Sequence, residues 1–201
     1  MLLKKNKNKI FFVHIPRTGG RYVTNLFMRN GFDFLFCDEF SFFKGINQRH
    51  LHHNYLKNFS VYKNNKKLAI IRDPLNRFIS AASVDMDTNR DKHKFKLNTV
   101  DNVIEYIKFQ QERYSYSTNW FRPQHEFISD DCFIWRYEDS FKKNFNNFIY
   151  KNFKVDLIVD EKISPWKVYY DYCPKIKITK VIEKAVKMVY EKDYQITIDF
   201  Y

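Results

Sequence analysis

Glycine and proline are scarce in this 201-residue chain, which contains only four glycines and five prolines. Such a composition excludes long flexible linkers and low-complexity stretches. No internal repeat is visible either. Together with the length, these features predict a single domain spanning residues 1–201, with one full hydrophobic core.

Cysteine is also sparse. Cys37, Cys132 and Cys173 are far apart and form no CxxC pair, which argues against a zinc site or a disulfide framework. Cys132 lies in an apolar run and is expected to be a buried thiol. No cluster of carboxylates suggests a metal site, so the sequence predicts chemistry that requires no metal.

Long apolar runs are missing as well. Residues 1–9 are charged and are not followed by the apolar stretch that a signal peptide needs, and the apolar run at residues 10–15 is too short to cross a bilayer. The sequence therefore predicts a cytoplasmic protein without a membrane span.

Hydrophobic residues make up 44% of the chain and aromatic residues 19%, which excludes a disordered protein. The formal net charge is +12. This charge has two interpretations: a field for an anionic partner such as a nucleotide, an acidic sugar or a nucleic acid, or a compositional bias toward lysine. The charge is informative only where it meets a motif that could bind phosphate.

Apolar runs at residues 10–15, 68–71 and 132–135 are typical of buried strands. Apolar residues at helical spacing lie at residues 23–30, 75–82, 100–107, 141–149 and 178–189. This alternation predicts an α/β fold, a three-layer P-loop-like sandwich with a mostly parallel central sheet flanked by helices. Residues 85–98 are charged and are expected to form a mobile surface loop.

The first chemically unusual turn is His-Ile-Pro-Arg-Thr-Gly-Gly-Arg at residues 14–21. A strand ends, a glycine pair lets the backbone approach a ligand closely, and a helix begins whose free N–H groups attract anions. Arg17 and Arg21 add full positive charges. The Walker A pattern GxxxxGK[ST] is absent. The alternative is an ordinary glycine turn with solvated arginines.

The second turn begins at Arg72, where a strand ends, and continues into Asp73-Pro74, a helix-start signal. Arg77 and Ser80 lie away from the apolar face of that helix. The guanidinium fork of Arg72 and the hydroxyl of Ser80 can bind a phosphate together. The alternative is that Arg72 pairs with Asp73 or another nearby carboxylate and that Ser80 is simply exposed.

Two anion-binding turns at one sheet edge suit a ligand with phosphates at both ends. The two segments resemble the motifs that bind 3′-phosphoadenosine 5′-phosphosulfate (PAPS) in the sulfotransferase superfamily. The nearest resemblance is to its carbohydrate, Golgi-type branch, sulfotransferase family 2, whose motifs read roughly HIPKTGGTS and RDPxxRFxSA. Residues 14–20 and 72–81 match these motifs, and weaker matches at 124–127, 135–138 and 189–194 extend the similarity over most of the chain.

The resemblance implies a role for each matching residue. Arg17 would replace the family's lysine on the 5′-phosphosulfate, and Arg72 and Ser80 would bind the 3′-phosphate. The loop around the 5′ end would comprise Thr18, Gly19, Gly20, Arg21 and Tyr22. The last two replace the family's Thr-Ser, so only their backbone N–H groups are sure to persist.

Sulfuryl transfer needs a base to accept the proton of the acceptor hydroxyl, and histidine suits this near neutral pH. The resemblance points to His50, which precedes Leu51, and next to His52; Glu39 and Glu138 are weaker candidates. Arg17 would stabilise the departing phosphate during in-line transfer. The alternative is that these histidines are solvated at a polar helix start. His14 is expected to be structural.

The resemblance makes a sulfotransferase acting on a saccharide hydroxyl the leading prediction, with a bacterial or viral source favoured. Two other functions stay open. One is a P-loop-like nucleotide kinase or hydrolase, which shares the strand, glycine-loop and helix arrangement. The other is a basic nucleic-acid-binding protein, although no nucleic-acid motif is recognised.

Overall fold

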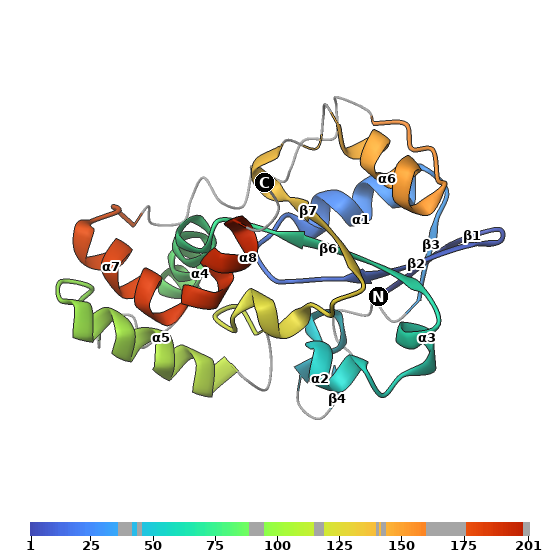
Figure 1. Ribbon diagram of the computed structural model, residues 1–201. Helices are drawn as coiled ribbons and strands as arrows, with labels where there is room; N and C mark the ends of the chain where they lie inside the picture. Colours follow the sequence, from blue (N-terminus) through green and yellow to red (C-terminus); the bar gives the residue numbers. More distant parts are fainter. Residues whose placement is uncertain are drawn as a thin grey trace.

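The computed structural model describes residues 1–35, 42–43, 46–88, 95–114, 119–139, 141, 144–159 and 176–198. Five strands form a central sheet in the order β3-β1-β2-β6-β7 (Figure 1). Their bounds are β1 (Leu2–Lys5), β2 (Asn8–Val13), β3 (Asp33–Leu35), β6 (Lys66–Ile71) and β7 (Cys132–Arg136). A separate antiparallel pair consists of β4 (Phe42–Phe43) and β5 (Ile46–Asn47).

The central sheet is mixed but mostly parallel, as expected, because all of its strands except β1 run in the same direction. The three strands predicted from the sequence, β2, β6 and β7, are mutually parallel. However, β1 pairs antiparallel with both β2 and β3. The pattern did not reveal β1 because only Leu2 and Leu3 are buried in it, and two exposed lysines follow. The three-layer, P-loop-like arrangement stays a prediction.

Helices cover both faces of this sheet (Figure 1). On one face α1 (Gly20–Arg29) and α6 (Phe145–Phe153) pack over the side chains of Phe12, Leu68 and Trp135. On the other face a second apolar cluster joins the sheet to α2 (His53–Leu56), α3 (Ser60–Lys63) and the 3-10 helix η2 (Gln124–Phe127). Two further 3-10 turns are η1 (Gln48–His50) and η3 (Tyr137–Asp139).

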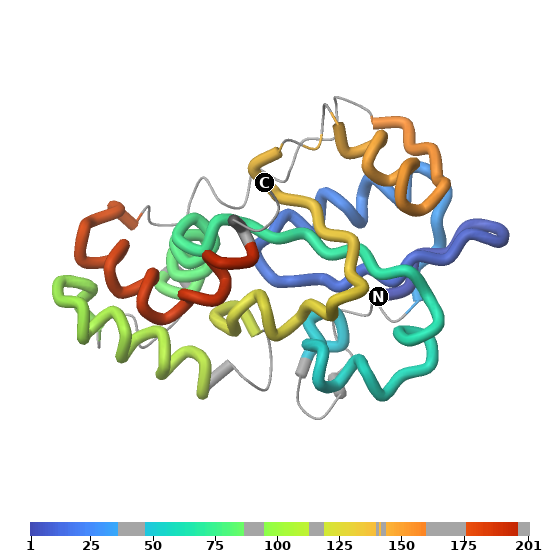
Figure 2. The backbone as a smooth tube through the Cα atoms, in the orientation of Figure 1, coloured from blue at the N-terminus to red at the C-terminus, as the bar shows by residue number. Residues whose placement is uncertain are grey.

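The remaining helices form a third apolar cluster at one end of the molecule (Figure 1). They are α4 (Pro74–Thr88), α5 (Val100–Tyr114), α7 (Lys180–Val189) and α8 (Glu191–Ile198). Because α4 follows β6 directly, this cluster lies at the carboxyl ends of the parallel strands. Figure 2 shows η2 between α8 and α2, and η2 contacts both helices.

The start of α4 is as predicted, because the Asp73 carboxylate accepts the N–H of Asn76 at 2.8 Å. The expected loop at 85–98 is wrong for residues 85–88, which belong to α4. Asp85 is buried there, and it accepts hydrogen bonds from Tyr106 and Gln110 of α5 at 2.8 and 2.7 Å. The charge at these positions is therefore compatible with a helix, because residues of α5 provide hydrogen bonds to the buried Asp85 carboxylate of α4. Residues 89–94, Glu39, Cys37 and Cys173 lie outside the described residues.

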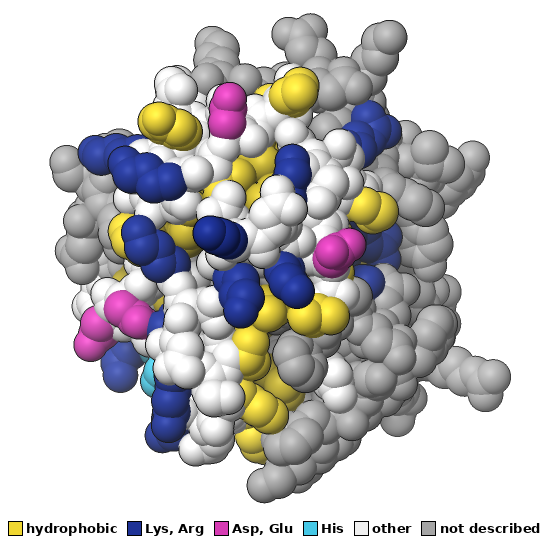
Figure 3. All heavy atoms as spheres, turned by 90° about the vertical axis from the view of Figure 1, so that its right-hand side faces the viewer, with side chains coloured by type: hydrophobic (Ala, Val, Ile, Leu, Met, Phe, Trp, Pro, Cys, Tyr) yellow, Lys and Arg dark blue, Asp and Glu magenta, His cyan; other side chains and the backbone are white. Residues whose placement is uncertain are grey.

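Positive charge is spread well beyond the carboxyl edge of the sheet. Figure 3 shows many lysines and arginines on the face that includes the tip of the β1–β2 hairpin, the opposite end from α4. Lys4, Lys5, Lys7 and Lys9 are exposed in that hairpin. The net charge alone therefore does not locate a site. Of the helices in the described ranges, none has the length and apolar character needed to cross a membrane.

Candidate active site

Aromatic and histidine rings pack closely against the turn between β2 and α1. Gly19 is the N-cap residue that precedes α1, in the left-handed region at φ 88°, and a Cβ there would lie 2.9 Å from ring carbons of Tyr137. A Cβ on Gly20 would lie 1.9 Å from Nε2 of His14. The buried Thr18 hydroxyl donates to the Ile15 carbonyl at 2.8 Å. Both glycines are thus required by their neighbours.

Arg17 extends from this turn to the second motif. Its Nη2 donates to both the Oγ and the carbonyl oxygen of Ser80 at 2.8 Å, and its Nε lies 3.2 Å from the same Oγ. The guanidinium also lies 5.5 Å from the ring centre of Trp120. The Arg17 backbone has φ 70°, which an arginine rarely adopts. The contact with Ser80 brings together two groups that the sequence assigns to opposite ends of one ligand.

Arg72 follows β6 and completes the meeting of the two motifs. Its Nη1 donates to the Arg17 carbonyl at 3.2 Å, and its guanidinium carbon lies 4.6 Å from the ring centre of Tyr137. Asp73, the expected alternative partner, instead caps α4. Its N–H donates to the Glu138 carboxylate at 2.9 Å. The first and second motifs therefore form one cationic region at the carboxyl ends of β2 and β6.

Arg77 is a third arginine of this region, and its burial differs from the sequence expectation. It is only 3% exposed, with Nε donating to the Pro16 carbonyl at 3.0 Å and Nη2 to the Trp120 carbonyl at 2.9 Å. Burial lowers the pKa of Arg77, and the positive charges of Arg17 and Arg72 lower it further. Arg77 therefore joins the first turn to the segment at 119–127, which is distant in the sequence but packs over the Arg77 side chain.

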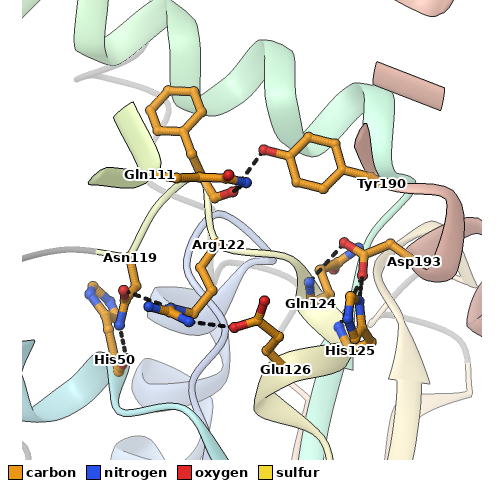
Figure 4. A network of polar contacts seen from close by, with 10 residues as sticks. His50, Gln111, Asn119, Arg122, Gln124, His125, Glu126, Tyr190 and Asp193 are labelled. Carbon is orange, nitrogen blue, oxygen red and sulfur yellow. Dashed lines mark hydrogen bonds and ion pairs between the residues drawn. The ribbon is translucent and has the colours of Figure 1, made fainter. Parts of the chain in front are cut away.

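The segment at 119–127, which we call the bridging loop, joins the parts of this region (Figure 4). Asn119 donates from its amide to the His50 carbonyl at 2.9 Å, and it accepts from Arg122 Nε at 3.0 Å. Arg122 also pairs with Glu126. The carbonyl of Phe121 accepts from Tyr190 Oη at 2.8 Å and from Gln111 Nε2 at 3.0 Å. The loop is thus bonded to η1, α5 and the α7–α8 junction.

His50 lies beside the first turn. Its ring meets the His14 ring edge to face, with centres 4.9 Å apart, and His14 in turn fills the space above Gly20. His14 is buried and stacks on Phe12, in keeping with a structural role. Burial holds the pKa of His14 well below its usual value, and His50 and nearby arginines lower it further. His14 is therefore neutral near pH 7.

His52 faces a different part of the molecule. It is buried against Tyr55 and Phe127, in the apolar cluster on the other face of the sheet. Burial lowers the pKa of His52 to about 4, and the charge of Arg122 also lowers it. At neutral pH this ring is uncharged and is a weak base.

Comparison with known proteins agrees with this geometry. A family model for sulfotransferase family 2, described as "Sulfotransferase family", matches residues 2–196. The chain belongs to the sulfotransferase family. The membership expected from the two motifs is confirmed, and with it a transferase fold of mixed α/β type. No curated protein and no solved structure matches the chain.

Within this member of the sulfotransferase family, one expected ligand residue points away from the turns. The Tyr22 ring is 7% exposed and packs on Phe141 with centres 4.7 Å apart, inside the apolar cluster under α1. Its N–H donates to the Gly19 carbonyl at 2.9 Å. The Tyr22 ring is thus part of the core, and its N–H is already bonded within the turn. Arg21, by contrast, is exposed at the start of α1.

Sequence reasoning missed Arg77, Trp120 and Asn119, which support the site. The one available signal for Arg77 was its place inside the second motif, between Arg72 and Ser80. Trp120 and Asn119 gave no signal, since their contacts with the site, from Trp120 to Arg17 and Arg77 and from Asn119 to His50, are with residues 40 or more positions away. Among the described residues, no group of three or more histidines, cysteines or carboxylates could bind a metal ion.

Proposed function

We propose that this protein transfers a sulfuryl group from PAPS to a hydroxyl of a carbohydrate or a similar acceptor. The observation that carries the proposal is the contact between the two motifs, in which Arg72 donates to the carbonyl of Arg17 and Arg17 donates to Ser80. Both motifs follow parallel strands at their carboxyl ends, where ligands of α/β sheets bind.

The residues present fit a phosphorylated ligand. Three guanidinium groups, those of Arg17, Arg72 and Arg77, lie close enough for two of them to lower the pKa of the third. The buried Nε of Arg72 has no hydrogen-bond partner within the described part of the chain. An unsatisfied buried donor is costly, and a phosphate oxygen is a strong acceptor for a guanidinium.

In this proposal, Arg72 and Ser80 bind the 3′-phosphate, which distinguishes PAPS from ATP-like donors. Arg17 and the N–H groups at the start of α1 bind the 5′-phosphosulfate, within the loop formed by Thr18, Gly19 and Gly20. Arg21 adds positive charge at the same helix end. The Tyr22 side chain takes no part in this loop, because it lies in the core.

Since Arg17 contacts Ser80 in this structure, donor binding must redistribute these hydrogen bonds. A 3′-phosphate that binds Ser80 would compete for the Oγ that Arg17 now uses. The guanidinium would then turn toward the 5′ end, where it can stabilise negative charge on the leaving group. When bound, PAPS supplies the sulfuryl group and the phosphate that leaves.

His50 is the residue that we propose as the base, with His52 second. The supporting observation is the contact of the His50 ring with His14, which packs on the first turn at Gly20. His52 is less suited, since its burial and its pKa of about 4 make it a weak acceptor of protons near pH 7.

Calorimetry with 3′-phosphoadenosine 5′-phosphate and with 5′-AMP tests the donor part of this proposal. We expect at least a roughly tenfold preference for the 3′-phosphorylated nucleotide, because charge-assisted hydrogen bonds to phosphate are strong. A screen of saccharide acceptors with labelled PAPS tests the transfer. Magnesium-dependent ATP turnover without a preference for the 3′-phosphate would favour a nucleotide kinase or hydrolase. Salt-sensitive nucleic-acid binding without nucleotide affinity would favour the other alternative.

A further inference from the structure

The side-chain amide of Gln124 forms hydrogen bonds with both the backbone N–H and the backbone carbonyl of Arg72. Its Oε1 accepts the Arg72 N–H at 3.0 Å, and its Nε2 donates to the Arg72 carbonyl at 2.8 Å. Gln124 is fully buried. Arg72 lies immediately after β6, where the sheet no longer supplies backbone partners. The glutamine amide takes the place of a neighbouring strand at this one residue.

Asp193 holds Gln124 in turn. This carboxylate lies on α8 and has no exposed surface. Its Oδ2 accepts the N–H of Gln124 at 2.7 Å, and its Oδ1 accepts the N–H of His125 at 3.0 Å. The Nδ1 of His125 lies 2.8 Å from the same Oδ1 (Figure 4). Through these bonds Asp193 fixes the start of η2, and with it the Gln124 side chain that bonds to Arg72.

The Asp193 carboxylate also interacts electrostatically with the arginines of the site. The negative charge of Asp193 opposes the lowering of the pKa of Arg77 by its neighbours. A buried carboxylate near three guanidinium groups reduces their repulsion but leaves a net positive charge. Partial neutralisation of this kind favours arginine side chains that are already ordered before an anionic ligand binds.

We propose that Gln124, anchored by Asp193, is a positioning residue that aims Arg72 at the 3′-phosphate of the donor; this inference rests on the proposed function. Gln124 touches no reacting atom and acts through Arg72. The guanidinium of Arg72 is otherwise guided by only one hydrogen bond in the described part of the chain, to the carbonyl of Arg17, and by the Tyr137 ring. Its direction therefore depends on how the backbone at residue 72 is held.

The test compares the affinities of Gln124→Met and the unmodified protein for 3′-phosphoadenosine 5′-phosphate and 5′-AMP, measured by calorimetry. Methionine retains the volume of glutamine but cannot form either hydrogen bond. We expect the affinity ratio of the two nucleotides to fall about tenfold, by loss of affinity for the 3′-phosphorylated form alone. In the double variant with Arg72→Ala, Gln124→Met should lower the ratio no further than Arg72→Ala does alone.

Gln111→Met is the matched control. Gln111 also bonds to the bridging loop, through the Phe121 carbonyl, but among the described residues it forms no hydrogen bond with Arg72. This variant should reduce stability without altering the nucleotide ratio. Should Gln124→Met fold poorly, Asp193→Asn replaces it, since the N–H groups of Gln124 and His125 bond to different carboxylate oxygens and asparagine replaces one of these oxygens with an NH₂ donor. The same selective loss is expected.

The outcomes separate the two proposals. If the unmodified protein shows no preference for the 3′-phosphate, the proposed function is wrong, and this inference is wrong with it. If the preference exists but Gln124→Met and Asp193→Asn leave the ratio unchanged, or weaken both nucleotides equally, only the positioning role is overturned.

Discussion

Arg17 and Ser80 are joined by a direct hydrogen bond, from Nη2 to Oγ at 2.8 Å, although 63 residues separate them in the chain. A second bond from the same nitrogen reaches the Ser80 carbonyl. The bond crosses from the first motif to the second and sets the starting state of the site. A donor that needs both residues must first replace this bond.

Ser80→Ala tests that replacement. Removal of the hydroxyl should weaken binding of 3′-phosphoadenosine 5′-phosphate about tenfold, because a hydroxyl that donates a hydrogen bond to the 3′-phosphate is lost. Binding of 5′-AMP should be unchanged or slightly tighter, since Arg17 is released more easily. Calorimetry measures both affinities. Ser83→Ala, one turn further along α4, should affect neither; equal losses for both nucleotides in Ser80→Ala would contradict the assignment.

His50→Ala tests the proposed base. We expect kcat for sulfate transfer to fall about 100-fold or more, the usual scale for loss of a general base, with little change in donor affinity. The control is His53→Ala, because His53 bonds to the Tyr62 hydroxyl at 3.0 Å on another part of the surface. Initial rates at saturating donor report the change. A kcat like that of the His53 variant would remove His50 as the base.

Tyr22→Phe tests whether the core, and not the donor, contacts position 22. The Tyr22 hydroxyl is buried without a hydrogen-bond partner among the described residues, and burial raises its pKa. Its removal should leave stability the same or raise it by about 1 kcal/mol. Urea unfolding measures this change, and calorimetry should give unaltered nucleotide affinity. A clear loss of affinity would return Tyr22 to the binding loop.

Stability should fall as the pH is lowered from 7 toward 4. His52 has its pKa lowered from 6.5 to about 4 in the folded state. In the unfolded chain this ring takes up a proton near pH 6.5, whereas the folded state resists it, so protons favour unfolding. Urea midpoints at pH 7.5, 6.0 and 5.0 measure the effect. In His52→Phe the fall should be shallower, with His14 contributing the remainder in the same direction; an unchanged slope would contradict the cause.

The two motifs could be predicted from the sequence because each is local. A strand end, a glycine pair and a helix start lie within eight residues at 14–21, and Asp73-Pro74 marks the start of α4. The parallel strands β2, β6 and β7 could be predicted for the same reason, because each is a short apolar run within one segment. Period and turn chemistry within one segment were sufficient there.

The rest depends on contacts between distant segments. Arg77 lies off the apolar face of its own helix, yet it is buried because Pro16 and Trp120 accept its hydrogen bonds. Asp85 is polar and buried because Tyr106 and Gln110 satisfy it. Helical periodicity predicts exposure for Arg77, and the charged sequence at 85–98 predicts a surface loop around Asp85, because both arguments consider one segment at a time. The missed strand β1 likewise takes its burial from its neighbours.

The left-handed backbone of Arg17, at φ 70°, has a consequence for engineering. A side chain in this conformation costs about 1 kcal/mol. Arg17→Gly would relieve that cost, but it would also remove the guanidinium and its hydrogen bonds to Ser80. The strained backbone is thus retained together with the side chain that joins the two motifs, so redesign of this turn for stability needs an activity screen at every round.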